Sequence, residues 1–249
     1  MKIKTETTNT VSSFVSFIEE TKEAEIALGN KADFLFRGQS TDEPLVPRLA
    51  RLKPKGSDLN KLERLMLDDF ERHSLPFREY EMIDQWDLLA LAQHHGLPTR
   101  LLDWTYSALA ALWFCVKRSP KKDQKGVLQD GVVWLFKTSV VDFIEFPTKE
   151  TPFSNQKTRI FRPRVVARRI QAQSGVFTCH KRMTDGRFIP LNKNKSYKQK
   201  LVKVNIPAAS FRNIKEQLEA CGVHRLILFP DLDGLAGYLE GRYFHEERL

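Results

Sequence analysis

The polar segment at residues 93–105 is the feature that most limits how this chain can fold. It reads Gln-His-His-Gly-Leu-Pro-Thr-Arg-Leu-Leu-Asp-Trp-Thr, and apolar runs flank it at residues 86–92 and 108–116. The chain must therefore carry many polar groups through or beside a core, where each needs a partner or a task. The segment predicts either a ligand site or a polar network that fixes a turn between two helices. The variety of its polar groups favours the ligand site.

Two shorter motifs accompany this segment. Residues 36–39, Phe-Arg-Gly-Gln, lie upstream, and residues 171–178, Gln-Ala-Gln-Ser-Gly-Val-Phe-Thr, lie downstream. Together the three motifs resemble the FRG domain, a family named for its Phe-Arg-Gly, over residues 30–240. The long central motif carries most of this resemblance, because the tripeptide alone is short.

Composition and cysteine usage are those of an ordinary globular protein in a reducing compartment. Of the 249 residues, 41% are hydrophobic and 29% are charged, as in a typical folded domain. No apolar run approaches the ~20 residues of a membrane helix, and the N-terminus lacks the apolar stretch of a secretion signal. The three cysteines are far apart and form no Cys-x-x-Cys pair, which argues against disulfides and zinc. We therefore expect a cytoplasmic protein with no membrane association.

Hydrophobic periodicity predicts helices in the first half of the chain and mostly strands in the second. The expected fold class is α+β, with a helix-rich N-terminal half packed on a mixed or antiparallel sheet. No linker interrupts the chain, so we expect a single FRG-type domain over residues 1–249, with an N-terminal helix in 1–30 and a core in 31–240. Ser57 and Asp231 are candidate N-caps. The expected helices lie at residues 8–28, 59–70, 86–94, 107–117, 208–220 and after 231, and the expected strands at 33–37, 131–136, 165–170, 175–179, 201–206 and 223–229.

Basic residues are concentrated in residues 157–203, which hold fourteen Lys or Arg and one acid, Asp185. The whole chain has a net charge of +9, so the remainder is net acidic. A local cationic surface favours binding to nucleic acid, and an acidic antitoxin or inhibitor protein is a further candidate partner. A solvated loop or an intersubunit contact fits the same composition. The candidate nucleic-acid-binding residues are Lys181, Arg182, Lys193, Lys195, Lys198 and Lys200.

Arg37 stands near the end of an expected strand, directly before Gly38. A guanidinium offers phosphate a planar two-pronged donor, and glycine allows a ligand to approach closely. A structural arginine paired with a core carboxylate, for example Asp103, fits the same pattern. The Phe-Arg-Gly setting is similar to the first motif of ADP-ribosyltransferases. That resemblance implies that Arg37 contacts a dinucleotide, with Gly38 and Gln39 beside it.

The central segment supplies further candidate ligand-binding groups. Arg100 and Asp103 are three residues apart and would meet if the segment were helical. Trp104 offers a ring on which a base or a nicotinamide could stack, and Thr99 is a neutral hydrogen-bonding group. His94 is a candidate acid or base, although a helix-terminal or core role fits it better. Adjacent histidines do not present two ligands on one helical face, so we expect no metal site.

Gln173 belongs to the downstream motif. On a strand, residues 171 and 173 point to the same side. Many ADP-ribosyltransferases carry a Gln/Glu-x-Glu element on a later core strand, where the final Glu stabilises the cationic ribose. The resemblance places Gln173 at that position, where glutamine can bind a ribose hydroxyl but cannot supply a negative charge. Asp103 is then the candidate substitute carboxylate, and a buried amide that satisfies backbone groups is the structural alternative for Gln173.

These resemblances imply a core similar to that of ADP-ribosyltransferases. The expected function is an NAD-dependent ADP-ribosyltransferase-like toxin or antiphage defence effector that acts on a macromolecule, with nucleic acid favoured by the basic segment. A non-catalytic module that binds nucleic acid or a nucleotide is the alternative. Asp103 and Gln173 are the candidate catalytic residues. The candidate residues for binding NAD are Arg37, Gly38, Gln39, Thr99, Arg100 and Trp104.

Overall fold

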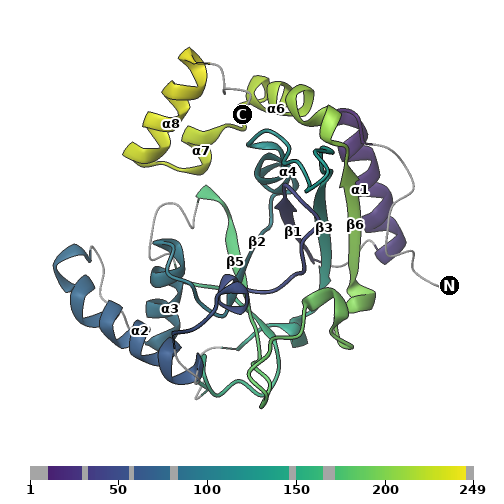
Figure 1. The fold of residues 1–249 in the computed structure, drawn as a ribbon. Coiled ribbons are helices and arrows are strands. Elements are labelled where there is room, and N and C mark those ends of the chain that lie inside the picture. Colours follow the sequence, from purple (N-terminus) through teal and green to yellow (C-terminus); the bar gives the residue numbers. More distant parts are fainter. Residues whose placement is uncertain are drawn as a thin grey trace.

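Six strands form one sheet in the computed structural model, which describes residues 11–29, 33–55, 59–78, 84–145, 150–164 and 172–244. Every neighbouring pair of strands is antiparallel, and the order across the sheet is β4-β5-β2-β1-β3-β6 (Figure 1). The predicted α+β class is confirmed. The strands are β1 (Asp33–Gln39), β2 (Leu101–Thr105), β3 (Gly131–Thr138), β4 (Arg159–Phe161), β5 (Gly175–Cys179) and β6 (Leu201–Ile206).

Helices from both ends of the chain pack against this sheet. Figure 1 shows the first helix beside β3 and β6, and a group of later helices gathered at one end of the sheet. Short 3-10 turns, such as the one at residues 208–210, join several of the elements. The helices are α1 (Phe14–Leu28), α2 (Leu59–Ser74), α3 (Gln85–His94), α4 (Ala108–Val116), α6 (Phe211–Ala220), α7 (Arg225–Leu228) and α8 (Leu232–Tyr243).

Local capping explains where several helices begin and end. Asp84 accepts hydrogen bonds from the first amides of α3, Ser107 caps α4, and Asp231 caps α8 as predicted. These side chains satisfy amides that have no partner within the helix. Gly29 and Gly96 follow α1 and α3 with φ angles of 105° and 83°, a conformation that glycine adopts without strain. The predicted helix over 8–28 begins at residue 14, and residues 1–10 lie outside the described ranges.

Helices cover one face of the sheet, which we call the helical face. Two hydrophobic cores lie on this face, and a third core lies on the opposite face. Strand register places Phe36, Thr105 and Asp103 on the same face, because residues paired across strands share a face. On that face α1, α4 and α6 cover β1, β3 and β6, and α3 covers β2, β4 and β5. On the opposite face, short turns and loops cover a third core that contains Trp104 and Trp134.

Gly38 allows α4 to lie directly on β1. A Cβ built at this position would lie 1.8 Å from the carbonyl oxygen of Ala111. Any other residue would therefore push the helix away from the strand. β1 is paired with β2 only at Phe36 and Thr105, whereas it is paired with β3 at every residue from Asp33 to Gln39. The two central strands diverge beyond that single pair, and this divergence opens the sheet between the two groups of helices.

One conditional expectation does not apply, and one prediction about secondary structure is wrong. Residues 101–105 form a strand, so the condition under which Arg100 and Asp103 would meet on a helical turn is not fulfilled. Gly96 and Pro98 end the helix, and all five strand residues then pair with β5. Residues 225–228 form helix α7 where a strand was predicted, because Leu228 and Phe229 pack against the core under α4 and find no neighbouring strand. Tertiary packing thus overrides the apolar, β-branched character of this run.

Some predicted elements lie outside the described residues. They are the strand over residues 165–170, the N-cap Ser57 and the residue Gln171. None of the helices in the described part of the chain is both long enough and apolar enough to cross a membrane.

Candidate functional site

A cleft of about 1170 Å³ opens at the gap where β1 and β2 diverge, and residues from both faces of the sheet line it. One wall comes from the C-terminal end of α3, and the other comes from α4 and the start of α8. The floor is made by the ends of β1 and β2. The chain therefore brings together residues 36–39, 93–96, 103–105, 173 and 231–233, which are far apart in the sequence.

Arg37 crosses the gap between the two central strands. Its Nη1 donates a hydrogen bond to the backbone oxygen of Asp103 at 2.8 Å and lies 3.8 Å from the Oδ2 of that residue. The Arg37 side chain is 18% exposed, and its Nε is buried with no partner among the described residues. Burial lowers the pKa of Arg37, although the carboxylate of Asp103 opposes this shift. Arg37 is thus only partly satisfied by the protein.

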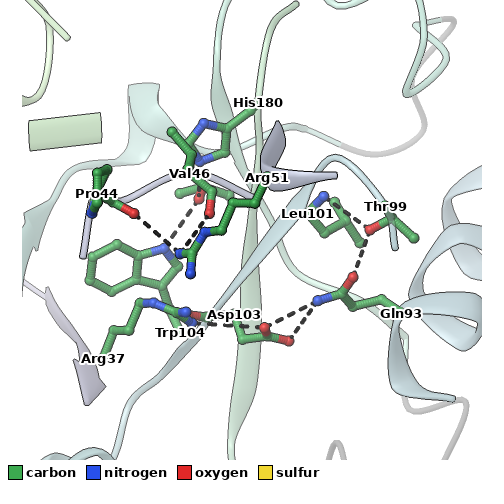
Figure 2. Close-up of polar contacts among 11 residues, drawn as sticks. Arg37, Pro44, Val46, Arg51, Gln93, Thr99, Leu101, Asp103, Trp104 and His180 are labelled. Carbon is green, nitrogen blue, oxygen red and sulfur yellow. Dashed lines mark hydrogen bonds and ion pairs between the residues drawn. The ribbon is translucent and has the colours of Figure 1, made fainter. Parts of the chain in front are cut away.

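Asp103 is held from one side and open on the other. The Nε2 of Gln93 donates to both carboxylate oxygens, at 3.1 Å each, and Thr99 fixes Gln93 by donating to its Oε1 at 2.7 Å. The amide of Leu101 in turn donates to the Thr99 hydroxyl at 3.0 Å. Figure 2 shows this chain of contacts leading to Asp103 beside Arg37. The Asp103 side chain remains 59% exposed, so it can contact a ligand.

Arg100 lies in the core and does not line the cleft. It forms a two-pronged pair with Glu63 of α2, with 2.9 Å between Nε and Oε1, and both side chains are 2% exposed. Its Nη1 donates to the carbonyl of Pro152, and its guanidinium lies over the ring of Phe153 at 4.7 Å. Arg100 therefore pairs with Glu63, and not with Asp103 as it would have done on a helical turn. Thr99 also lies outside the cleft and acts on it only through Gln93.

Trp104 borders the cleft, but its ring packs in the core on the other face of the sheet. The side chain is 3% exposed. Its Nε1 donates to Thr178 Oγ1 at 3.1 Å, and its ring centroid lies 5.3 Å from that of Phe136. The expected stacking face is therefore covered by protein. The aromatic ring that the cleft gains comes from Phe114 of α4, which the sequence analysis did not select.

His180 extends the buried network behind Trp104. Its Nε2 lies 3.1 Å from the Thr178 hydroxyl, and the side chain is fully buried. Burial, followed by the nearby charge of Arg37, lowers the pKa of His180 to about 3. The imidazole is therefore neutral near pH 7.

Gln173 lies at the edge of the cleft, two residues before β5. Its side chain Nε2 donates a hydrogen bond to the backbone carbonyl of Leu228 at 2.9 Å. Its backbone carbonyl accepts a hydrogen bond from Thr105 Oγ1 at 2.6 Å. The predicted structural alternative, an amide that satisfies backbone groups, matches the contact with Leu228. The side chain oxygen of Gln173 has no hydrogen bond to the described residues that would occupy it.

The other predicted binding residues of β1 also border the cleft, but Gln39 has a structural partner. Its Oε1 accepts a hydrogen bond from Trp134 Nε1 at 3.1 Å. Arg51, Lys117 and Lys121 add positive charge to the lining, and the sequence analysis did not select them. Each of them lies at or after an ordinary turn or helix end. The neighbouring sequence therefore does not mark them as binding residues.

The basic segment divides into paired and exposed cations. Lys200, a predicted nucleic-acid contact, binds the buried carboxylate of Asp142 at 2.7 Å, so it has a structural partner. Lys195 and Lys198 are exposed. Lys193 is exposed as well, whereas Lys181 and Arg182 are half-buried, and Arg182 Nε donates to the carbonyl of Gly186 at 3.1 Å.

No cysteine lines the cleft. Within the described ranges, no three His, Cys, Asp or Glu side chains are grouped so that they could hold a metal ion. Cys115 and Cys179 are buried. Burial raises the pKa of both thiols, that of Cys179 to about 12, so neither is a reactive thiolate near pH 7.

Comparison with known proteins identifies the part of the chain that builds the cleft. Residues 32–124 match the family model of the FRG domain. The matched region holds β1, α3, β2 and α4, and hence Arg37 and Asp103. No curated protein and no solved structure matches the chain significantly. The match confirms the predicted FRG domain, which this chain contains at residues 32–124.

Proposed function

We propose that the cleft binds NAD and that the protein transfers ADP-ribose to a macromolecule, with nucleic acid the favoured acceptor. One observation carries the proposal. Arg37, Asp103 and Gln173 lie in three separate motifs of the sequence, yet all three line the same cleft. The resemblance to ADP-ribosyltransferases expects an arginine on the first core strand and a Gln/Glu element on a later one, and Arg37 lies on β1 while Gln173 directly precedes β5.

The size of the cleft and the placement of its cations suit a dinucleotide. Its volume of about 1170 Å³ is somewhat above the ~300–1,000 Å³ that small-molecule pockets commonly have. Carboxylates also line the cleft, and Glu43 among them is paired with Arg51. Arg37 offers a guanidinium to the pyrophosphate, and Lys117 and Lys121 add cations from the α4 side. Phe114 offers an apolar ring surface in the same lining. A phosphate group would also give the buried Nε of Arg37 a charged neighbour.

The transfer step needs negative charge near the ribose. The bond between ribose C1′ and the nicotinamide nitrogen breaks, and neutral nicotinamide leaves with the bonding electrons. An oxygen or nitrogen of the acceptor then bonds to C1′, and its proton is released. The ribose is cationic between these events, so a carboxylate beside it stabilises the transition state. Asp103 is exposed, and Gln93 fixes its orientation.

Gln173 fits a positioning role in this proposal. Its Nε2 is committed to the carbonyl of Leu228, which leaves its side chain oxygen to accept a hydrogen bond from a ribose hydroxyl. His94 and His95 at the cleft wall are the nearest titratable groups that could take up the acceptor proton. A transferase of this kind would serve as a toxin or an antiphage defence effector.

A non-catalytic module that binds nucleic acid is the second candidate. It is favoured by the exposed Lys195 and Lys198 within the basic segment, and by Gln173 at the position where a transferase carries a glutamate. Such a module would bind polyanions with an affinity that falls steeply with added salt, since bound cations release condensed counterions. It would leave NAD intact.

Turnover of labelled NAD separates these two functions. The purified protein is incubated with NAD labelled in the adenine, together with RNA, single-stranded DNA, duplex DNA or cell protein. The transferase releases nicotinamide and moves the label onto one acceptor class, and an Asp103→Asn variant does neither. Nucleic-acid binding without release of nicotinamide supports the second candidate and contradicts the first.

A further inference from the structure

A second pocket lies beside the cleft, at the end of the sheet where α4, α6, α7 and α8 meet (Figure 1). Its volume is about 470 Å³. The lining holds one carboxylate, Glu219, against five cationic side chains, so the pocket is strongly positive. Lys117 lines both this pocket and the cleft. The five cations are Lys117, Arg118, Lys215, Arg225 and Arg242.

Three of these cations are available to a ligand. Arg118, Arg225 and Arg242 make no ion pair with any carboxylate in the described ranges. Arginines left without a carboxylate around a concave surface repel one another, and a bound anion relieves that repulsion. The fork of each guanidinium also matches the oxygens of a phosphate.

Gly237 sets the position of one of these arginines. A Cβ built at this residue would lie 2.1 Å from Cζ of Arg225. The missing side chain therefore leaves room for the guanidinium of Arg225 to lie against α8. The pocket gains a cation at a defined place through a glycine within a helix, a position where glycine otherwise weakens the helix.

Aromatic rings form the other part of the lining. The rings of His224 and Tyr238 lie 4.6 Å apart with an interplanar angle of 32°, and Trp113 and Phe229 border the same pocket. The Nδ1 of His224 is buried and has no partner within the described part of the chain. Cations beside aromatic rings are the combination that recognises a base together with its phosphate.

We propose that this pocket binds a nucleoside phosphate, with the phosphate at Arg225 and Arg242 and the base against the aromatic rings. The nucleoside phosphate is either a free nucleotide or one unit of a nucleic-acid strand. The pocket lies outside the cleft, so this inference goes beyond the proposed transfer of ADP-ribose and does not depend on it. In a strand, the shared Lys117 would connect the bound unit with the cleft.

Equilibrium binding tests the proposal without any turnover. AMP and a short fluorescent single-stranded RNA are titrated into the full-length protein at low salt, and the same titrations are run on Arg37→Lys to weaken binding in the cleft. Saturable binding of either probe is expected in both proteins. Binding of AMP indicates a free nucleotide, and binding of RNA alone indicates a strand. If neither probe binds, or if Arg37→Lys removes all binding, the proposal is wrong.

Two charge reversals of equal size locate the binding. The double variant Arg225→Glu with Arg242→Glu should lower the affinity for the probe at least tenfold. The double variant Lys195→Glu with Lys198→Glu should change that affinity less than twofold. The result is overturned if the lysine variant loses the binding and the arginine variant keeps it, because the basic segment then holds the ligand. Equal losses in both variants also overturn it, since they reflect net charge alone.

A third variant keeps every charge in place. Gly237→Ala should displace the guanidinium of Arg225 and weaken binding severalfold, while the melting temperature stays the same or rises because alanine favours a helix. Unchanged affinity in Gly237→Ala would contradict the role given to Arg225.

Discussion

Two arginine–carboxylate pairs each have one member in residues 100–103, and their surroundings differ completely. Arg100 and Glu63 bind each other through two hydrogen bonds and are 2% exposed. Arg37 and Asp103 lie 3.8 Å apart at the closest charged atoms, and Asp103 is 59% exposed. The first pair has its hydrogen bonds filled by protein, so it holds α2 against the sheet. The second has capacity left for a ligand, so it is the pair to test for function.

The divergence of β1 and β2 explains this difference. Asp103 lies on β2 at the place where the ladder to β1 has ended, so its side chain faces open space on the helical side. Arg100 lies before β2, under the loop that contains Pro152 and Phe153. The comparison teaches that a polar motif can hold a buried, fully paired charge and an exposed, partly paired charge only three residues apart.

Removal of the buried carboxylate should have the largest effect. In Glu63→Gln, the guanidinium of Arg100 stays buried without a negative partner, and the free energy of unfolding should fall by about 3–5 kcal/mol. Urea unfolding followed by circular dichroism measures the loss. Glu216→Gln is the matched control, because its pair with Arg212 is exposed and should contribute less than about 1 kcal/mol. Similar stability of the two variants would show that the buried pair is not structural.

Neutralising the open carboxylate should give the reverse pattern. In Asp103→Asn, release of nicotinamide should fall about a hundredfold, the lower end of the effect of removing a catalytic carboxylate, while the unfolding free energy changes by less than about 1 kcal/mol. Asp185→Asn removes an exposed carboxylate that pairs with Arg187 and should leave turnover unchanged. A large drop in melting temperature for Asp103→Asn would instead make Asp103 a structural partner of Arg37.

The buried His180 gives a smaller, pH-dependent effect beside Arg37. Its pKa of about 3 in the folded protein is well below the ~6.5 of an unfolded chain. Between these values the unfolded state binds a proton that the folded state does not, so stability should fall as the pH drops below about 6.5. The slope from this group is at most about 1.4 kcal/mol per pH unit.

His180→Gln isolates this contribution. Urea unfolding at pH 7, 6 and 5 should show a weaker dependence on pH in the variant than in the wild type, because carboxylates contribute equally to both. Parallel curves would show that His180 is not the titrating group.

Much of the fold could be predicted from local patterns. The helix over 107–117 and the strand over 131–136 were predicted from uninterrupted apolar runs with clear boundaries, and both are confirmed. Residues 101–105 could not be recognised as a strand, because their burial depends on pairing with β5, more than 70 residues further along the chain. The run at 223–229 was misread because an apolar segment of this length suits a strand or a short helix equally well.

The candidate site was predicted in part. Arg37, Asp103 and Gln173 were selected by type and motif, and the fold brings all three to one cleft. Arg100 was selected on the same grounds but lies in the core. The sequence did not reveal this, because its partner Glu63 is 37 residues away and no local pattern marks the pair. Gln93 was inside the central motif, but its role became visible only through its two hydrogen bonds to Asp103.

Calorimetric titration of NAD into the wild-type protein and Arg37→Lys tests the central claim most directly. Lysine keeps the positive charge but lacks the two-pronged donor. The account predicts saturable binding to the wild type and affinity at least about tenfold weaker in Arg37→Lys, as expected for loss of a hydrogen bond between charged groups. Unfolding of both proteins in urea should be the same within about 1 kcal/mol. No heat of binding in the wild type, or equal affinity in the two proteins, would contradict the claim that the Arg37 and Asp103 cleft is a nucleotide site.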